Sequence, residues 1–431
     1  MTHRSRRGFM AMALAGLLLS WLISCGGGPS STVTDPEAGG AQEVEFWTMQ
    51  LQPEFTDYFN QLITTYESQN PGVKVRWVDV PWGDMPSKIL TAVTAGTAPD
   101  VVNLNPDFAA QLASKKAWMP LDGKVSPADQ QRYLPKIWQA NRLKDTSFGI
   151  PWYLTTNITL YNQQLLETAG VKPPTTYAEL AQVARAVKEK TGKYAYFTTF
   201  VPQDAGDVLQ SFVQMGVDLV DDQGRAAFNT PAGKAVFQYW TDLYQQDLLP
   251  REVLTQGHRR AIDLFQAGEV ALLSTGAEFL PTIATNAPDI ARVTRSSPQI
   301  TGDTGQQNVA VMNLVIPAKT DVPEAALAFA LYLTNDANQL SFAKAAGVLP
   351  STVAALKDSY FTAVPGSEPS PADQARAVSA AQMAQAEVLV PPMDGVQELQ
   401  AILYDNLQAA MLGQKTVDQA VSDAAAAWDG R

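Results

Sequence analysis

Cysteine and histidine are almost absent from this chain of 431 residues. It contains one cysteine, Cys25, and two histidines, His3 and His258. An internal disulfide is therefore excluded, and a Cys/His metal site is disfavoured. The chain also lacks G-x-S-x-G, a Walker loop, G-x-G-x-x-G and H-E-x-x-H. A Ser-His-Asp enzyme would have to use His258, which we interpret as a surface residue at a helix start. We expect no metal and no cofactor.

Charge is also scarce, and its balance is acidic. Only 17% of the residues are charged, and the net charge is −12. An acidic surface argues against nucleic acid and against charge-driven binding to anionic lipid. The 46% of hydrophobic residues is typical of a globular protein. The chain is longer than a single compact hydrophobic core usually supports, so we expect two lobes or domains.

Residues 1–24 have the features of an export signal. Arg4, Arg6 and Arg7 precede "MAMALAGLLLSWLI", residues 10–23, which has no charge. This run is too short to cross a bilayer comfortably, which takes about 20 apolar residues. "SRRGFM" resembles a twin-arginine signal but lacks the basic residue that often follows. Sec and twin-arginine export both stay open.

Cys25 follows this segment directly. "LISC" resembles the lipobox of bacterial lipoproteins, in which the thiol receives a diacylglyceryl group. Two or more acyl chains give stable anchoring. Residues 25–42 are rich in Gly, Ser, Pro and Thr, which predicts a flexible tether. A catalytic thiol is disfavoured, and a plain secreted or cytosolic protein is the alternative.

The first part of the body predicts a parallel sheet. Strands are expected at 43–50, 73–80 and 99–105, and the segments 53–69 and 81–98 between them have helical character. The order β-α-β-α-β is typical of parallel strands with helices on both faces. Ligands of such sheets bind beyond the carboxyl ends of the strands. Those ends are "WTMQ", "VPWGDM" and "NLNPDF".

The rest of the body alternates helices and strands. We expect helices at 176–192, 206–215, 232–249 and 323–336, followed by C-terminal helices. Strands are expected at 194–200 and 308–317, and 217–231 reads as a hairpin with "DDQG" as its turn. Residues 259–276 predict a helix, a glycine turn and a strand. Trp77, Trp118 and Trp240 are expected in the core.

Several of these segments together resemble the family 1 extracellular solute-binding proteins of ABC importers, which include the maltose-binding protein. "FWT", "NPGVKV", "AGTAPDVV" and "WMPLD" are followed by "GIPWY…LYNQQLLETAG", "FQAGEVALLSTG", "VIPAKT" and "KAAGVLPS". Each motif is weak alone, but their order and spacing are specific. The resemblance covers nearly all of the chain after the tether.

This resemblance implies a two-lobed α/β fold of the periplasmic-binding-protein type, with a ligand cleft between the lobes. Two or three segments would cross between them, near 149–157, 308–314 and 349–355. The N-terminal lobe would comprise 43–150 plus 314–350, and the C-terminal lobe 151–313 plus 351–431. A ligand would be enclosed by hinge closure.

The family carries its ligand contacts on strand-end and crossing loops. In this chain those loops offer aromatic, amide, hydroxyl and carboxylate side chains. The candidates are Thr48, Gln50, Trp82, Asp84, Asn105, Asp107, Trp152, Tyr153, Thr155, Thr275, Glu278, Phe279, Asn313 and Asp394. Asn105 and Asp107 could instead cap a helix, and Tyr153 could serve hinge packing.

No Lys or Arg occurs in these loops, so a phosphate or carboxylate ligand is disfavoured. Flat aromatic faces with amides and carboxylates suit a neutral sugar. Amines stay possible, since aromatic and acidic groups can hold a cation. Maltose-binding members have a Trp after the glycine that matches Gly276, whereas this chain has Ala277, Glu278 and Phe279. Fewer stacking faces favour a mono- or disaccharide or a small glycoside.

The sequence thus predicts an exported, membrane-anchored monomer that captures a sugar and delivers it to an ABC permease, without catalysis. One alternative is a secreted carbohydrate-active enzyme with paired carboxylates drawn from Asp84, Asp107 and Glu278. Others are a receptor for a glycerophosphate-type solute or an amine, and a chemosensory or adhesion lipoprotein on the same fold.

Overall fold

The structure, a computed structural model, describes residues 41–431 except Lys144, Gln203, Ala205, residues 364–369, Pro391, Pro392 and Asp394. The side chain of Asp107 is also outside the description. The expected signal segment, Cys25 and most of the tether lie outside the described residues.

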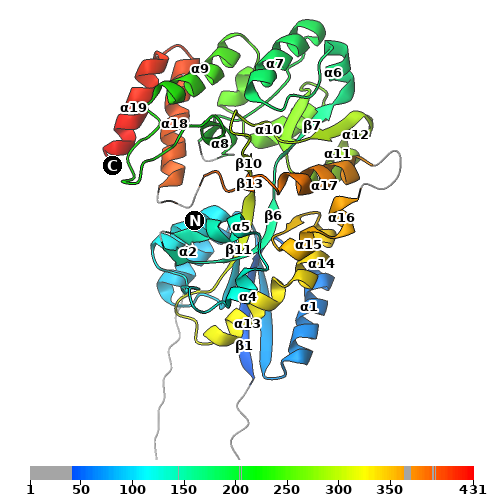
Figure 1. Cartoon of the computed structure of the whole chain (residues 1–431), viewed down its shortest axis with the longest axis vertical. Coiled ribbons are helices and arrows are strands. Elements are labelled where there is room, and N and C mark those ends of the chain that lie inside the picture. Colours follow the sequence, from blue (N-terminus) through cyan, green and yellow to red (C-terminus); the bar gives the residue numbers. More distant parts are fainter. Residues whose placement is uncertain are drawn as a thin grey trace, which may run out of the picture. The chain divides into compact units, whose positions relative to one another are not determined.

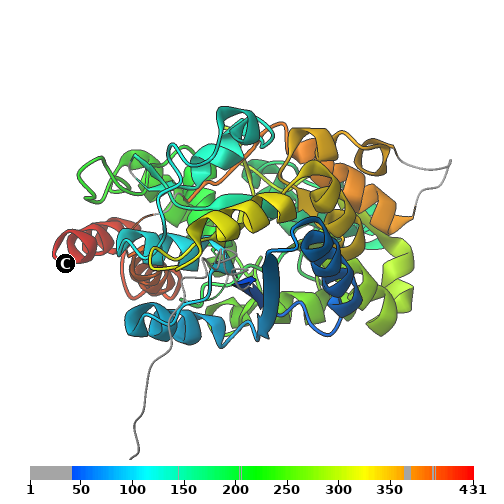
Figure 2. The same ribbon diagram turned by 90° about the horizontal axis from the view of Figure 1, so that it is seen from below.

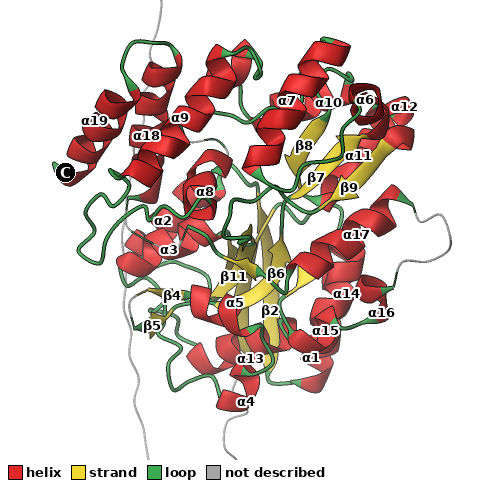
Figure 3. Ribbon diagram, turned by 45° about the horizontal axis from the view of Figure 1, so that its top comes forward, coloured by secondary structure: helices red, strands yellow, loops and turns green. Residues whose placement is uncertain are grey.

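The larger sheet has six strands in the order β12-β6-β11-β3-β1-β2. Their bounds are β1 Gln42–Met49, β2 Val73–Val80, β3 Val101–Leu104, β6 Ile150–Thr155, β11 Ala310–Val315 and β12 Leu349–Pro350. β1 pairs in parallel with β2 and β3, whereas β11 is antiparallel to both β3 and β6. Helices pack around this sheet, as Figure 3 shows.

The expected β-α-β-α-β unit is confirmed. Helix α1 (Thr56–Gln69) joins β1 to β2, and helix α2 (Met85–Ala95) joins β2 to β3. Helix α1 buries Phe59, Leu62 and Tyr66, which recur at helical spacing on one face. It begins three residues later than Pro53 because residues 52–55 form turns.

A second sheet lies farther along the chain. It has the order β8-β7-β9, with β7 antiparallel to both neighbours. Its strands are β7 Ile158–Asn162, β8 Leu272–Thr275 and β9 Thr294–Ser297. The surrounding helices are α6 Gln163–Ala169, α7 Tyr177–Thr191, α8 Asp207–Gln214, α9 Pro231–Gln245, α10 His258–Gln266, α11 Leu280–Asn286 and α12 Pro288–Val293, with 3₁₀ turns η1 Arg251–Leu254 and η2 Ala277–Phe279.

Two expected β elements are smaller than the sequence indicates. Residues 194–200 form no full strand, and Tyr194 makes only a bridge to Val270. The expected hairpin at 217–231 reduces to the bridge between Val220 and Ala226. Its turn closes because Asp221 Oδ1 accepts the N–H groups of Gln223 and Arg225, both at 2.9 Å.

The remaining helices lie around the two sheets (Figure 1 and Figure 2). The helices are α3 Pro106–Ser114, α4 Pro127–Gln130, α5 Pro135–Ala140, α13 Pro323–Leu333, α14 Asp336–Ala346, α15 Val353–Leu356, α16 Ser359–Thr362, α17 Pro371–Gln382, α18 Val396–Met411 and α19 Val417–Asp429. The short strands are β4 Arg142–Leu143, β5 Thr146–Ser147, β10 Gln307–Asn308 and β13 Ala386–Glu387; β4 pairs with β5 and β10 with β13.

The buried apolar residues gather around each sheet separately. One cluster extends from Val44 to Tyr153 and from Met312 to Phe342, and it includes Trp118. The other extends from Ile158 to Ile300 and from Ala375 to Trp428, and it includes Trp240. Both tryptophans are therefore core residues, as expected, while Trp77 is half-buried against the first cluster. Two cores are the arrangement of a two-lobed fold.

The chain passes from the first sheet to the second over very few residues. β6 ends at Thr155 and β7 begins at Ile158. A small apolar cluster lies at this junction, with Leu154, Val309, Val311 and Leu349 among its members. In the described part of the chain, no helix is long and apolar enough to cross a membrane.

Candidate functional site

The carboxyl ends of the parallel strands present one large exposed aromatic group. Trp82 follows β2 and is 46% exposed. Its backbone N–H donates to Gln50 Oε1 at 3.2 Å, which joins the loops after β1 and β2. Gln50 is exposed and has a φ of 53°. Asp84 is also exposed, and its side chain makes no cap hydrogen bond to α2. These three side chains are available to a solute.

Thr48 is not available in the same way. It is fully buried, and its hydroxyl donates to Asp79 Oδ1 at 2.6 Å and accepts from Trp77 Nε1 at 2.8 Å. Asp79 also accepts the N–H groups of Leu51 and Gln52 at 2.9 and 3.1 Å. Both side chains shape the loop after β1, and we therefore leave Thr48 out of the proposed ligand set.

Asn105 acts as the N-cap of α3. Its Oδ1 accepts the N–H of Phe108 at 2.9 Å, which leaves the amide NH₂ as the donor that could reach a solute. Asp107 lies in α3, but its side chain is outside the description. Asp394 also lies outside the described residues.

Trp152 belongs to the core. It is 1% exposed, and its ring stacks on Phe342 with centroids 5.0 Å apart and planes 19° from parallel. Phe46 and Phe59 cover other parts of the indole. The expectation of a ligand-stacking face rested on placing Trp152 at a strand end. Because β6 continues to Thr155, its side chain points into the first core instead, and we remove it from the ligand set.

Tyr153 and Glu278 lie close enough to influence each other. Tyr153 is 9% exposed, and burial raises the pKa of its phenol, as do the charges of Asp79 and Glu278. Glu278 lies on η2, with its carboxylate folded over Gly276. Its side chain still contacts solvent, yet the surrounding protein removes enough hydration to raise the pKa of the carboxyl. Residues of the first sheet and of η2 therefore share one polar environment.

A cavity of about 20 Å³ lies at this junction. Thr155 and Glu278 line it, together with Arg376 and Ser379 of α17. Ser379 Oγ is buried without a hydrogen-bond partner among the described residues. Arg376 pairs with Asp373 at 2.6 Å, and its guanidinium lies 4.1 Å from the ring centroid of Tyr360. The loops chosen from sequence contain no basic residue, but α17 adds one.

A second cavity of about 20 Å³ contains Asn313 in its lining. Asn313 is 1% exposed, its Nδ2 donates to the carbonyl of Val311 at 3.0 Å, and its Oδ1 has no partner among the described residues. Asn141 Nδ2 in the same lining is also unpartnered. Met393 and Val396 also line this cavity. Thr275 is buried, and its hydroxyl has no hydrogen-bond partner in the part of the chain that the structure describes. Phe279 packs partly against the second core.

Sequence reasoning missed a polar group at the end of the second sheet. Asp207 begins α8, and Asn157 Nδ2 donates to its Oδ1 at 3.0 Å. Burial raises the pKa of the Asp207 carboxyl, and the electrostatic interaction with nearby His258 opposes this rise. Tyr177, Tyr196 and Gln210 line the same cavity of about 20 Å³. The available sequence signal was an acid at the start of the helix expected at 206–215.

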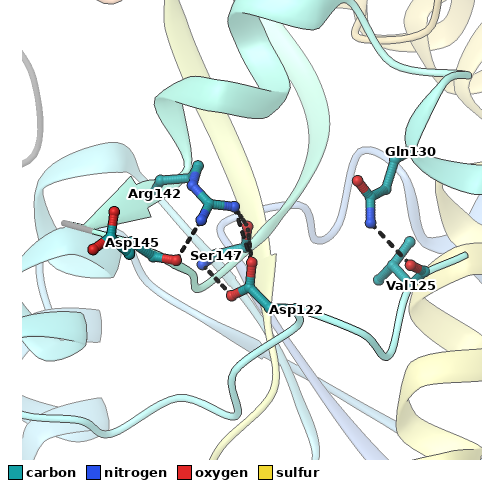
Figure 4. Close-up of polar contacts among 6 residues, drawn as sticks. All are labelled: Asp122, Val125, Gln130, Arg142, Asp145 and Ser147. Atoms are coloured by element: carbon teal, nitrogen blue, oxygen red, sulfur yellow. Dashed lines mark hydrogen bonds and ion pairs between the residues drawn. The ribbon is translucent and has the colours of Figure 1, made fainter. Parts of the chain in front are cut away.

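A polar cluster holds the chain just before β6 (Figure 4). Arg142 Nη1 donates to Asp122 Oδ1 at 2.9 Å and to Ser147 Oγ at 2.7 Å. The N–H of Ser147 donates to Asp122 Oδ2 at 2.8 Å. Burial opposes ionisation of Asp122, but these two donors outweigh it and lower the carboxyl pKa. The cluster fixes the β4–β5 hairpin and the start of the crossing strand.

No three His, Cys, Asp or Glu side chains are arranged to hold a metal ion within the described residues. The amide, hydroxyl and carboxylate groups named above, together with the exposed indole of Trp82, suit a solute bound through hydrogen bonds and aromatic contact.

Solved structures resemble the whole described body. A "putative oligosaccharide periplasmic-binding protein" of Synechococcus sp. MITs9220, solved in complex with zinc, is 47% identical, with a TM-score of 0.83 and coverage of 90% of this chain and 98% of that one. The cyclic alpha-maltosyl-1,6-maltose binding protein of Arthrobacter globiformis is 22% identical, with a TM-score of 0.78 over 91% and 99% of the two chains.

Among curated proteins, the arabinooligosaccharide-binding protein of Halalkalibacterium halodurans is 24% identical over 271 residues, 61% of this chain and 59% of the relative. The family model of the bacterial extracellular solute-binding proteins matches residues 52–340. This match, together with the 47% identity to the Synechococcus protein, shows that the chain belongs to the bacterial extracellular solute-binding protein family.

Proposed function

We propose that this protein is the carbohydrate-binding component of an ABC importer. The observation that carries the proposal is Trp82, a largely exposed indole at the carboxyl edge of a parallel sheet, beside Gln50 and Asp84. An indole face covers the apolar C–H surface of a sugar ring, and the amide and carboxylate bind its hydroxyl groups. Sugar-binding proteins among the structural relatives support this class of ligand.

The proposed ligand lies between the two lobes, with the boundaries 43–150 plus 314–350 and 151–313 plus 351–431. Gln50, Trp82, Asp84 and the amide of Asn105 bind it from the first lobe, and Glu278 and Phe279 from the second. Thr155, which lines one cavity with Glu278, and Tyr153 complete the proposed set from the crossing strand. Contacts from both lobes favour closure, because a ligand shifts an equilibrium only by its differential affinity.

We propose a neutral mono- or disaccharide or small glycoside as the solute. Among the candidate residues that the structure describes, Trp82 is the one aromatic side chain that is more than one-third exposed. A single exposed aromatic face limits the length of sugar that can be stacked. Arg376 is held by Asp373 and Tyr360, and its charge is thereby neutralised locally rather than offered to an anionic solute.

The proposed setting is the outer side of the cytoplasmic membrane or the periplasm. Lipidation of Cys25 would anchor the chain as a monomer near its permease, to which it delivers the sugar. Globomycin blocks the cleavage of lipoprotein precursors, and a larger precursor should accumulate in its presence. An unchanged mobility in gel electrophoresis would contradict the anchor.

The test of function is a thermal-shift screen of neutral mono- and disaccharides, followed by calorimetric titration. A binding sugar raises the unfolding midpoint by mass action and is recovered unchanged. Sugar turnover would instead support a carbohydrate-active enzyme. Glycerol phosphate and an amine such as choline serve as the matched charged solutes, and a shift with either in place of the sugars would contradict a neutral ligand.

A further inference from the structure

A fourth and larger pocket lies away from the candidate ligand site. Its volume is about 270 Å³, compared with about 20 Å³ for each cavity described above. The last turn of α2, residues 96–98, residues 115–117 and residues 317–319 form its walls. A water molecule occupies roughly 30 Å³ in the liquid, so the space suits a small molecule or a headgroup.

This pocket lies at the opposite edge of the larger sheet from Trp82. β2 and β3 run parallel to β1, and their carboxyl ends lead into the loops at 81–84 and 105. Helices α2 and α3 follow these strands and run back, so that their last residues reach the amino edge of the sheet. A ligand in this pocket cannot be the solute bound beside Trp82.

Three lysines give the pocket a positive charge. Lys115, Lys116 and Lys319 all line it and are exposed, and none of its lining residues is acidic. Among the described residues, none of the three has an ion-pair partner. Asp100, which follows the 96–98 wall, already accepts the N–H of Glu45 at 2.8 Å and the hydroxyl of Thr320. In a chain with a net charge of −12, this local excess of cations is unusual.

The backbone holds one of these lysines in a costly conformation. Lys116 has a φ of 57° just after α3, a position where glycine is usual. The left-handed region is unfavourable for a residue with a Cβ, because the Cβ approaches the following carbonyl oxygen too closely. Val93, Ala98 and Ala117 also line the pocket and supply its apolar floor. A lysine ammonium provides three N–H donors and acts as a point-charge binder of phosphate.

We propose that this lysine pocket binds a phosphate-bearing ligand, the chemistry shared by the headgroup of an anionic phospholipid and a free phosphomonoester. Phosphate oxygens accept from the three ammonium groups, and the glycerol portion covers the apolar floor. The interaction is electrostatic at its rim and weakens as salt is added, because the Debye length shortens.

The test measures amide hydrogen exchange of residues 93–98, 115–119 and 318–319 in the full-length chain. In non-ionic detergent, glycerol 1-phosphate is compared with glycerol. In a second arm, the chain is reconstituted in phosphatidylcholine vesicles with or without phosphatidylglycerol. We expect exchange to slow at least threefold with the phosphate-bearing probe of one or both arms. Slowing by glycerol phosphate indicates a free ligand, and slowing only by phosphatidylglycerol vesicles indicates a headgroup.

The variant Lys115→Ala/Lys116→Ala/Lys319→Ala should lose this protection. Its matched control, Lys124→Ala/Lys172→Ala/Lys357→Ala, removes three other exposed lysines and should keep it. Sugar binding and the unfolding midpoint of both variants report folding. No protection in either arm, or equal loss in the two variants, would overturn the proposal and leave the three lysines as solvated surface charges.

Discussion

Two Pro-Trp pairs in this chain have the same local sequence and opposite environments. Trp82 follows Pro81 and is 46% exposed, whereas Trp152 follows Pro151 and is 1% exposed. Trp82 lies beyond the end of an outer strand of the larger sheet, and Trp152 lies within β6, between β11 and β12. The difference teaches that the place of a tryptophan within the sheet, rather than its neighbours in sequence, decides whether it can contact a solute.

The largest effect is expected from Trp152→Ala. Removing a buried indole that contacts Phe46, Phe59 and Phe342 should lower the free energy of unfolding by about 3–5 kcal/mol. Urea denaturation measures this change. A decrease in the free energy of unfolding below about 1 kcal/mol would contradict the comparison, because it would mean that the buried indole of Trp152 contributes little to the stability of the first core.

Trp82→Ala should show the opposite profile. Because Trp82 is largely exposed, stability should change by less than about 0.5 kcal/mol. Loss of one stacking face should weaken sugar binding by roughly 1 kcal/mol or more, about fivefold. Calorimetric titration measures the affinity, with Trp82→Phe as the control that keeps an aromatic face. Wild-type affinity in Trp82→Ala would remove the first lobe's main contact from our proposed site.

A smaller, pH-dependent effect is expected from Asp122→Asn, which weakens the support of the strand that carries Trp152. The folded pKa of Asp122 is lowered, so its contribution to stability is present above the unfolded pKa near 4 and is lost as pH falls through the folded pKa. Asp122 is partly exposed, and we expect a loss of about 1 kcal/mol at pH 7.

Denaturation of the Asp122→Asn variant and the wild-type chain at pH 7 and at pH 3 measures this dependence. The difference between the two chains should shrink at the lower pH. Asp145→Asn is the matched control, because the structure uses the backbone carbonyl of Asp145, rather than its side chain, to bind Arg142. An equal difference at both pH values would show that the cluster acts through packing rather than charge.

The sequence predicted the fold well where hydrophobic periodicity is strong. The parallel unit of β1, β2 and β3 is confirmed because its strands are short, apolar and separated by regular helices. The expected strand at 194–200 and the hairpin at 217–231 were overestimated. Residue patterns there allow an extended backbone, but tertiary packing leaves only single bridges at Tyr194 and Val220.

The candidate site was harder to predict because it depends on contacts between distant residues. Thr48 lies directly opposite Asp79 in the pairing of β1 with β2. Because of this register, the Thr48 hydroxyl is already hydrogen-bonded to Asp79 and is not available to a ligand. Asp207 and Arg376 lie on helices α8 and α17, and the one sequence signal, an acid at the start of the helix expected at 206–215, does not show which cavity that acid lines. Their placement follows from how α8 and α17 pack, which no local motif describes.

The short passage from β6 to β7 has a mechanical consequence. Only Thr156 and Asn157 separate the two strands, and each has two soft backbone dihedral angles. Gln299 and Gln382 hold both residues through buried hydrogen bonds to the Thr156 hydroxyl and the Asn157 carbonyl. Any relative rotation of the lobes along this connection must therefore be concentrated in these few backbone dihedral angles. The hydrogen bonds from Gln299 and Gln382 resist such a rotation, so the connection is stiff rather than freely jointed.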